Sequence, residues 1–148
     1  MKKRYRKAVF IIVYKKESGR ILYLLLKRKK HWKGREFPKG GIEKGESELQ
    51  AVKREVKEET SLKAIKIKNY HKKGEYRYQK KMRDRKDFFG QTYSLYSAEV
   101  ACGKVRIDKK EHSGFKWASY EKALKLLTWK DQRECLKIAN KELLNEIW

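Results

Sequence analysis

The chain has 148 residues and is strongly basic, with 41 Lys and Arg against 19 Asp and Glu and a formal charge of +22. Charged residues make up 41% of it, well above the roughly 25% of an ordinary soluble domain, which leaves apolar residues for one core but no surplus for a second. No apolar run approaches the ~20 residues of a membrane span. We therefore expect a single domain over residues 1–148 that has no membrane partner.

The first part of the chain alternates apolar runs with turn-rich segments. Residues 8–14 and 21–26 are continuous apolar runs, which predict two buried strands. The sequence Glu-Ser-Gly-Arg at residues 17–20 predicts a hairpin turn between them. Residues 31–45 contain four glycines and the only proline, so this segment is predicted to be a loop.

The remaining elements follow in a mixed order. A helix is predicted first, and strands are then predicted over residues 63–70, 88–100 and 115–118. Two helices over residues 120–127 and 131–148 close the chain. Strands, a helix, more strands and further helices indicate a mixed α/β domain and not a regular βαβ repeat.

The two cysteines give a hint about the compartment. Cys102 and Cys135 form neither a CxxC pair nor a disulfide framework. Reduced thiols in structural positions are typical of cytosolic proteins, so we expect a cytoplasmic location.

The first helix is predicted from a cap and an apolar stripe. Ser47 is a suitable N-cap for a helix over residues 48–60, which contain neither Gly nor Pro. At about 100° per residue, Leu49, Val52 and Val56 fall within one narrow stripe. We expect this stripe to pack against the core.

The same helix carries an acidic face. Glu55, Glu58 and Glu59 stand at i, i+3 and i+4 and share a face about 100° away from the apolar stripe, so we expect it to point away from the core. Three adjacent carboxylates repel one another unless a cation lies among them, and their oxygens suit Mg²⁺ or Mn²⁺. The alternative is a solvated face on which Lys53 and Lys57 form ion pairs with them.

The segment before and within this helix resembles the Nudix hydrolases. Their pattern is Gly-x5-Glu-x7-Arg-Glu-U-x-Glu-Glu-x-Gly-U, where U is a bulky apolar residue. The matching residues of this chain are Gly40, Glu46, Arg54, Glu55, Val56, Glu58, Glu59 and Leu62. The one departure is Ser61, which stands where the pattern has a glycine that would end the helix in a left-handed conformation.

The resemblance implies a fold, a reaction and a set of site residues. The fold is an α/β/α sandwich with a central mixed sheet. The reaction is metal-dependent hydrolysis of a nucleoside diphosphate linked to another group, with Mg²⁺ or Mn²⁺ as cofactor. Metal-site residues implied in this way are Glu55, Glu58, Glu59 and Gly40, while Arg54 would orient a glutamate as part of the catalytic set and Glu46 would brace the loop.

Further residues resemble the asymmetric diadenosine tetraphosphate hydrolases within that family. They are His31-Trp32, Pro38-Lys39-Gly40 and Glu111-His112 followed by Trp117. The resemblance implies that Glu111 adds a carboxylate to the metal site and that diadenosine tetraphosphate is cleaved to ATP and AMP. The implied substrate-binding residues are His31, Lys39, Tyr76, Tyr78, Lys81 and Phe115, whose ring would stack on adenine.

Each of these residues has a structural alternative. His31 and Trp32 could anchor a loop, Phe115 and Trp117 could belong to the core, and Glu111 could pair with its lysine neighbours at the surface.

The reaction also has alternatives. The basic segment from Lys72 to Lys86 carries interleaved aromatic residues, which is typical of a path for single-stranded RNA, so an RNA 5′-pyrophosphohydrolase is the main rival. Another Nudix pyrophosphatase acting on (d)NTPs or nucleotide sugars, or a silent nucleotide-binding or RNA-binding module, also fits. The charge of +22 agrees with a polyanionic partner, but it also occurs in lysine-rich proteins that bind none.

Overall fold

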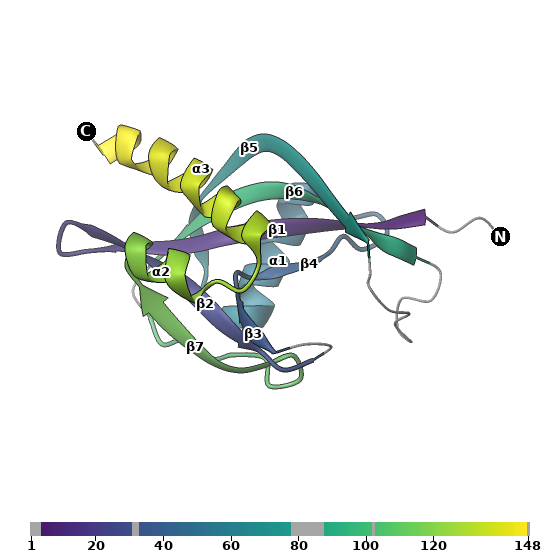
Figure 1. The fold of residues 1–148 in the computed structure, drawn as a ribbon, viewed down its shortest axis with the longest axis horizontal. Coiled ribbons are helices and arrows are strands. Elements are labelled where there is room, and N and C mark those ends of the chain that lie inside the picture. The colour runs from purple at the N-terminus through teal and green to yellow at the C-terminus, as the bar shows by residue number, and fades with distance from the viewer. Residues whose placement is uncertain (1–3, 31–32, 78–87, 102, 148) are drawn as a thin grey trace.

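The structure, a computed structural model, describes residues 4–30, 33–77, 88–101 and 103–147. Seven strands form one sheet, and three helices pack against it (Figure 1). The strands are β1 (Arg4–Glu17), β2 (Arg20–Arg28), β3 (Gly34–Glu36), β4 (Lys39–Gly41), β5 (Ala64–Arg77), β6 (Phe88–Val100) and β7 (His112–Ala118). The helices are α1 (Glu48–Thr60), α2 (Tyr120–Leu126) and α3 (Lys130–Ile147). None of the helices described is both long and apolar enough to cross a membrane.

The sheet is mixed, as the family resemblance implied. Its order is β3-β2-β1-β6-β5, with β4 paired to β1 and β7 paired to β2. The pairing of β1 with β6 is parallel, whereas the other pairs are antiparallel. Strand β1 lies in the middle of the sheet and pairs with β2, β4 and β6.

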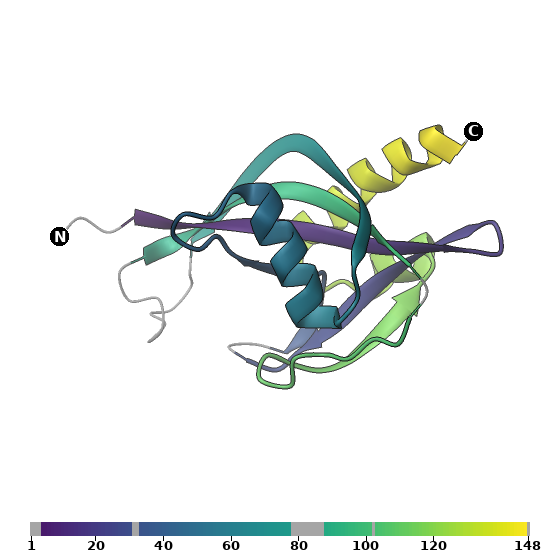
Figure 2. The same ribbon diagram turned by 180° about the vertical axis from the view of Figure 1, so that it is seen from behind.

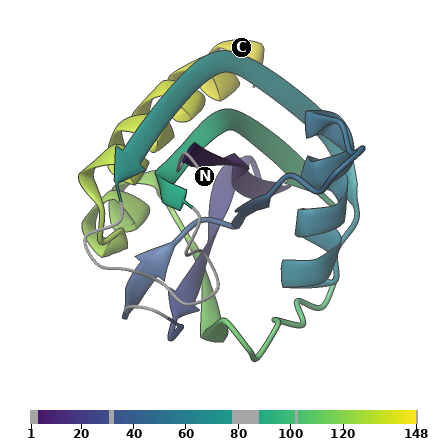
Figure 3. The same ribbon diagram turned by 90° about the vertical axis from the view of Figure 1, so that its right-hand side faces the viewer.

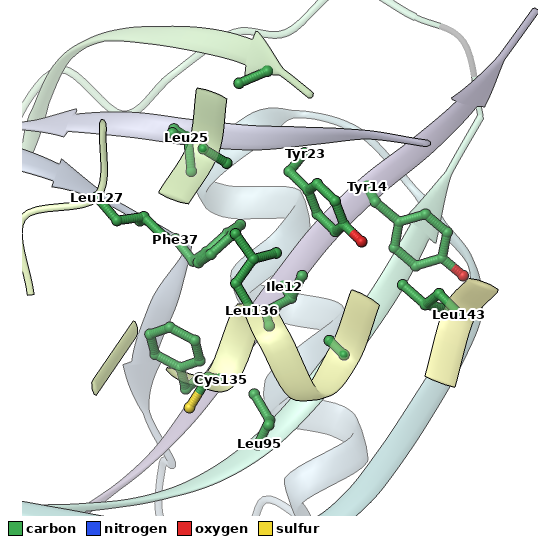
Figure 4. Close-up of a cluster of buried hydrophobic side chains, with 14 residues drawn as sticks. Ile12, Tyr14, Tyr23, Leu25, Phe37, Leu95, Leu127, Cys135, Leu136 and Leu143 are labelled. Carbon is green, nitrogen blue, oxygen red and sulfur yellow. The ribbon is translucent and has the colours of Figure 1, made fainter. Parts of the chain in front are cut away.

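Helices cover both faces of the sheet, so the fold is an α/β/α sandwich. Helix α1 lies on one face, and α2 and α3 lie on the other (Figures 2 and 3). Alternate residues of the apolar run in β1 enter two separate clusters: Ile12 and Tyr14 face α3, whereas Ile11 and Val13 face α1. Figure 4 shows the cluster beneath α3, in which Leu136 packs beside the β1 side chains. A strand buried on both faces explains why this run is continuously apolar.

Most of the predicted elements are present. The predicted bounds differ from the observed ones where a segment pairs with a strand that is distant in the sequence. The hairpin turn lies at Ser18 and Gly19, both with positive φ (50° and 75°). The segment 31–45 is not a loop throughout, because β3 pairs with β2 and β4 pairs with β1. Strand β5 runs beyond residue 70 through an irregularity at His71, and β7 begins at His112 and not at residue 115.

Helix α1 has the predicted bounds and cap. Ser47 accepts a hydrogen bond from the Gln50 N–H, and the Gln50 side chain accepts one from the Ser47 N–H, which completes a capping box. Ser61 adopts the left-handed conformation (φ 65°) that glycine would have at this position, and its N–H donates to the Lys57 carbonyl. The loss of glycine therefore leaves the helix end intact.

The apolar stripe of α1 is only partly as predicted. Val52 and Val56 are fully buried, but Leu49 is 46% exposed, so the prediction that it faces the core is wrong. Glu48 turns toward the sheet instead, where it accepts hydrogen bonds from Ser94 and Tyr96 of β6. The first turn of the helix is therefore held to the sheet by the polar contacts of Glu48 and not by the apolar contact expected of Leu49.

Candidate active site

Strand β4 lies directly against the acidic side of α1. The Lys39 N–H donates to Glu59 Oε2 at 3.3 Å, and Arg54 Nη2 donates to the Gly41 carbonyl at 2.9 Å. A Cβ atom on Gly40 would lie 2.0 Å from the Glu55 carboxylate. Glycine is therefore required at residue 40 so that β4 can approach the carboxylates this closely.

Arg54 connects the loop before α1 with the helix itself. Its Nε and Nη2 donate to the two oxygens of Glu46 at 2.7 and 2.8 Å, a bidentate pair. Its Nη1 donates to Glu55 Oε1 at 2.7 Å and to Glu58 Oε2 at 3.2 Å. The hydrogen bonds that Arg54 donates to Glu46 hold the pKa of Glu46 at about 2 and raise the pKa of Arg54. The guanidinium thus fixes one oxygen of Glu55.

The acidic face of α1 does not point away from the core, contrary to the prediction. Glu55 and Glu59 are buried at 8% and 3% exposure, and only Glu58 is exposed. Burial raises the pKa of Glu55 to about 7, although Arg54 opposes the shift. Burial also raises the pKa of Glu59 well above its ordinary value, with the nearby carboxylates of Glu55, Glu36 and Glu111 adding to the effect. Two buried, mutually repelling carboxylates are the expected environment for a bound cation.

Strands β2 and β3 and the turn before β7 add a second group of charges to this site. Arg28 Nη1 lies 3.1 Å from Glu36 Oε2 and 3.5 Å from Glu111 Oε2, and Arg28 and Glu36 are buried. Burial alone would raise the pKa of Glu36, but Lys39, His112 and Arg28 together hold it at about 2. Glu111 is thus an ion-pair partner of a buried arginine, and the alternative of a surface pair with its lysine neighbours does not describe it.

Arg28 and Glu36 were not singled out in the sequence. Arg28 lies two residues after Leu26 on β2, and Glu36 pairs with Leu26 from β3, so both are on the face of Leu26 that α1 covers. Strand periodicity could have placed them on that face, but the pairing of β2 with β3 was needed to bring them together.

Several of these charged side chains line a pocket with a volume of about 100 Å³. Among the described residues, five carboxylates and three cationic side chains line it, which gives a formal charge of −2 in a chain whose total is +22. The lining residues are Arg6, Arg28, Lys39, Gly40, Gly41, Glu55, Glu58, Glu59, Gln91, Asp108 and Glu111. An acidic pocket in a basic protein fits a divalent cation, and the oxygen ligands of Glu55, Glu59 and Glu111 are those that Mg²⁺ and Mn²⁺ take.

The implied substrate-binding residues are only partly within the described structure. Lys39 lines the pocket with its Nζ 3.4 Å from Glu36 Oε1, and Phe115 on β7 is 43% exposed and not part of the core. Tyr76 lies on β5, where it pairs with Gln91. His31, Tyr78 and Lys81 lie outside the described residues.

Trp117 lies beside the apolar cluster beneath α1, and the start of the basic segment lies on β5. Trp117 packs against the cluster beneath α1, and Lys15 Nζ lies 4.5 Å from the centre of its ring. Of the basic segment, Lys72, Lys73 and Arg77 are exposed on β5, and residues 78–86 lie outside the described residues.

Comparisons with known proteins agree with this geometry. The asymmetrical bis(5′-nucleosyl)-tetraphosphatase of Caenorhabditis elegans is 26% identical over 137 residues, covering 88% of this chain and 91% of that protein. A crystal structure of a C. elegans Ap4A hydrolase binary complex superposes with a TM-score of 0.78 at 25% identity, covering 95% of this chain and 98% of the other. The NUDIX domain of Shewanella oneidensis NrtR, complexed with ADP ribose, shares the fold at 19% identity with a TM-score of 0.76, covering 95% and 90% of the two chains. Residues 4–137 match the NUDIX domain family, and the protein is therefore a Nudix hydrolase.

Proposed function

We propose that this Nudix hydrolase cleaves diadenosine tetraphosphate to ATP and AMP in a reaction that depends on Mg²⁺ or Mn²⁺. The observation that carries the proposal is the placement of buried carboxylates, pocket cations and an exposed aromatic ring on one face of the sheet. Leu26 pairs with Glu36 on one side and with Phe115 on the other, so Glu36 and Phe115 lie on the face that α1 covers. Similarity to the two C. elegans proteins named above supports the choice of substrate.

The cation would be held by Glu55, Glu59 and Glu111. Glu58 is exposed and bonded to Arg54, so it would join at the rim of the site. When bound, a divalent cation neutralises phosphate oxygens and lowers the pKa of an attacking water. The raised pKa values of Glu55 and Glu59 support this assignment, because a cation favours the ionised carboxylates that burial disfavours.

Residues of the chain supply the remaining steps. Arg54 fixes Glu55 Oε1, and the other oxygen receives no hydrogen bond from the described residues, so Oε2 is the oxygen of Glu55 that would face the cation or accept a proton from the attacking water. Lys39 and Arg28 line the pocket and would bind the phosphates that the carboxylates repel. Their pairing with Glu36 keeps both cations in place before the substrate arrives.

Phe115 would hold one adenine of the dinucleotide. Its ring is exposed on the same face of the sheet as Glu36, and an aromatic ring can stack on a base of any identity. We expect cleavage to be asymmetric because one nucleotide stacks beside the metal site while the rest of the polyphosphate extends beyond it.

A second candidate is hydrolysis of the 5′-triphosphate of RNA. Exposed Lys72, Lys73 and Arg77 on β5 favour it, because β5 pairs with β6 at Gln91, which lines the pocket. An RNA chain leaving the pocket along β5 would contact these cations.

A product assay separates the candidates. Purified protein with Mg²⁺ or Mn²⁺ is offered diadenosine tetraphosphate, 5′-triphosphorylated RNA, dNTPs and ADP-ribose, and the products are resolved by anion-exchange chromatography. ATP and AMP in equal amounts, formed only with the metal, support the proposal. Two molecules of ADP from the dinucleotide, or pyrophosphate from RNA without turnover of the dinucleotide, would overturn it.

A further inference from the structure

His112 on β7 is a buried histidine with one occupied and one unoccupied ring nitrogen. Its Nε2 lies 2.7 Å from Glu36 Oε2, and both side chains are completely buried. Glu36 also faces Arg28 at 3.1 Å and Lys39 at 3.4 Å, so its carboxylate is ionised and can only accept a hydrogen bond. Nε2 is therefore the nitrogen that carries the proton.

The other ring nitrogen, Nδ1, is buried and has no hydrogen-bond partner among the described residues. With Nε2 facing Glu36, Nδ1 is the ring nitrogen left to act as an acceptor or as a metal ligand. Buried polar atoms without a partner are rare in folded proteins, so this one requires an explanation.

Two carboxylates lie beside this ring. One ligand atom each from Glu59, Glu111 and His112 lie within 4.8 Å of one another. Bonds of ~2.1 Å to a shared ion would bring such atoms to roughly 3–4 Å, a movement within reach of small side-chain rotations. We propose that His112 Nδ1 is a nitrogen ligand of the divalent cation that Glu59 and Glu111 bind.

Glu36 completes this arrangement. A histidine that binds a metal through one nitrogen commonly donates its other N–H to a carboxylate, which fixes the tautomer and the orientation of the ring. Glu36 accepts that hydrogen bond here, and its ion pairs with Arg28 and Lys39 hold it in place. Glu36 is thus a positioning residue for the ligand His112.

A nitrogen ligand changes which ions the site prefers. Imidazole binds first-row transition ions in preference to Mg²⁺, which takes oxygen ligands almost exclusively. The site should therefore bind Mn²⁺ or Co²⁺ more tightly than a site made of carboxylates alone. The inference rests on the proposed metal-dependent function, because it names a further ligand of the same cation.

Pulsed EPR of the Mn²⁺-loaded protein tests the inference without relying on turnover. The ¹⁴N of a directly bound imidazole modulates the electron spin echo, and ¹⁵N-histidine labelling replaces that modulation without changing any residue. The chain has three histidines, so a His31→Asn/His71→Asn variant retains His112 alone. We expect the ¹⁴N modulation in the wild type and in this double variant, and its replacement by the ¹⁵N pattern in both after labelling.

The matched variant removes the nitrogen but keeps the hydrogen bond to Glu36. His112→Gln places an amide N–H near Glu36 and should abolish the modulation, with Mn²⁺ affinity at least ~10-fold weaker and Mg²⁺ affinity within about threefold. The inference would be overturned if the labelled double variant showed no ¹⁵N pattern. It would also be overturned if the ¹⁴N modulation persisted in His112→Gln. If the wild type hydrolysed the dinucleotide with Mg²⁺ but showed no nitrogen coupling with Mn²⁺, only the histidine ligand would be refuted. If the wild type showed the coupling but hydrolysed no nucleotide, only the proposed function would be refuted.

Discussion

Alanine in place of Gly40 should disable the metal site and leave the fold in place. The added Cβ would lie 2.0 Å from the Glu55 carboxylate, whereas ordinary contact begins at 3.4 Å, so the carboxylate must move by about 1.4 Å. The carboxylate is the far end of a flexible side chain and can rotate away, so β4 itself need not move. The backbone of residue 40 is outside the left-handed region, so alanine introduces no strain there.

The expected effect follows from that displacement. A misplacement of ~1 Å at a reacting group lowers the rate by about 100-fold, which corresponds to ~2.7 kcal/mol of transition-state stabilisation. We expect kcat/KM for diadenosine tetraphosphate to fall at least ~100-fold in Gly40→Ala and Mn²⁺ affinity, measured calorimetrically, to fall at least ~10-fold. The Tm should remain within ~3 °C of the wild type, because the clash is relieved by one side chain.

Gly114→Ala is the matched control. Gly114 lies on β7, where an added Cβ meets nothing within 4 Å and the backbone is likewise outside the left-handed region. This variant should keep wild-type Mn²⁺ affinity and turnover. The reasoning would be refuted if Gly40→Ala bound Mn²⁺ and turned over like the control, or if its loss of activity were accompanied by a fall in Tm of more than ~10 °C.

Three further outcomes are expected. Glu59→Gln should lower kcat at least ~100-fold. It should also raise the Tm of the metal-free protein, because it removes an ionisable carboxylate whose charged form is disfavoured by burial. An unchanged kcat at saturating Mg²⁺ would contradict the role of Glu59 as a metal ligand. In EDTA the wild type should lose stability as the pH rises from about 5 to about 7.5. The reason is that the pKa of Glu55 is raised to about 7 in the folded state, which therefore binds a proton that the unfolded chain releases. Glu55→Gln should show a weaker pH dependence of stability in the same thermal melts. Phe115→Ala should raise KM for the dinucleotide by ~5-fold or more through lost stacking with an unchanged Tm, and an unchanged KM would place the adenine elsewhere.

Local sequence determined the carboxylate helix and most of the other elements, although not the short strands β3 and β4. The Ser47 cap, the absence of Gly and Pro and the spacing of the glutamates define α1 without reference to any other part of the chain. The apolar run of β1 likewise predicts a buried strand, and its alternate residues enter the clusters on the two faces of the sheet. The resemblance to the Nudix pattern also pointed to Gly40 and Arg54, which connect the segment before the helix with the helix itself.

Tertiary structure decided the electrostatic character of the site. Helical periodicity places Glu55 and Glu59 beside each other, but only the approach of β4 buries them and raises their pKa values. The same holds for Leu49, whose place at the sheet is taken by the polar contacts of Glu48. Burial of a surface depends on what packs against it, which a single element does not encode.

The group formed by Arg28, Glu36 and His112 depended most on the fold. The three residues come from β2, β3 and β7, and Glu36 and His112 are 76 residues apart in the chain. Strand pairing brings them into one buried cluster, because β2 is the shared neighbour of β3 and β7. The sequence by itself determined which helix carboxylates could bind a metal ion. The pairing of distant strands determined which basic side chains and which histidine surround those carboxylates. Register across a sheet is set by long-range contacts and not by local spacing.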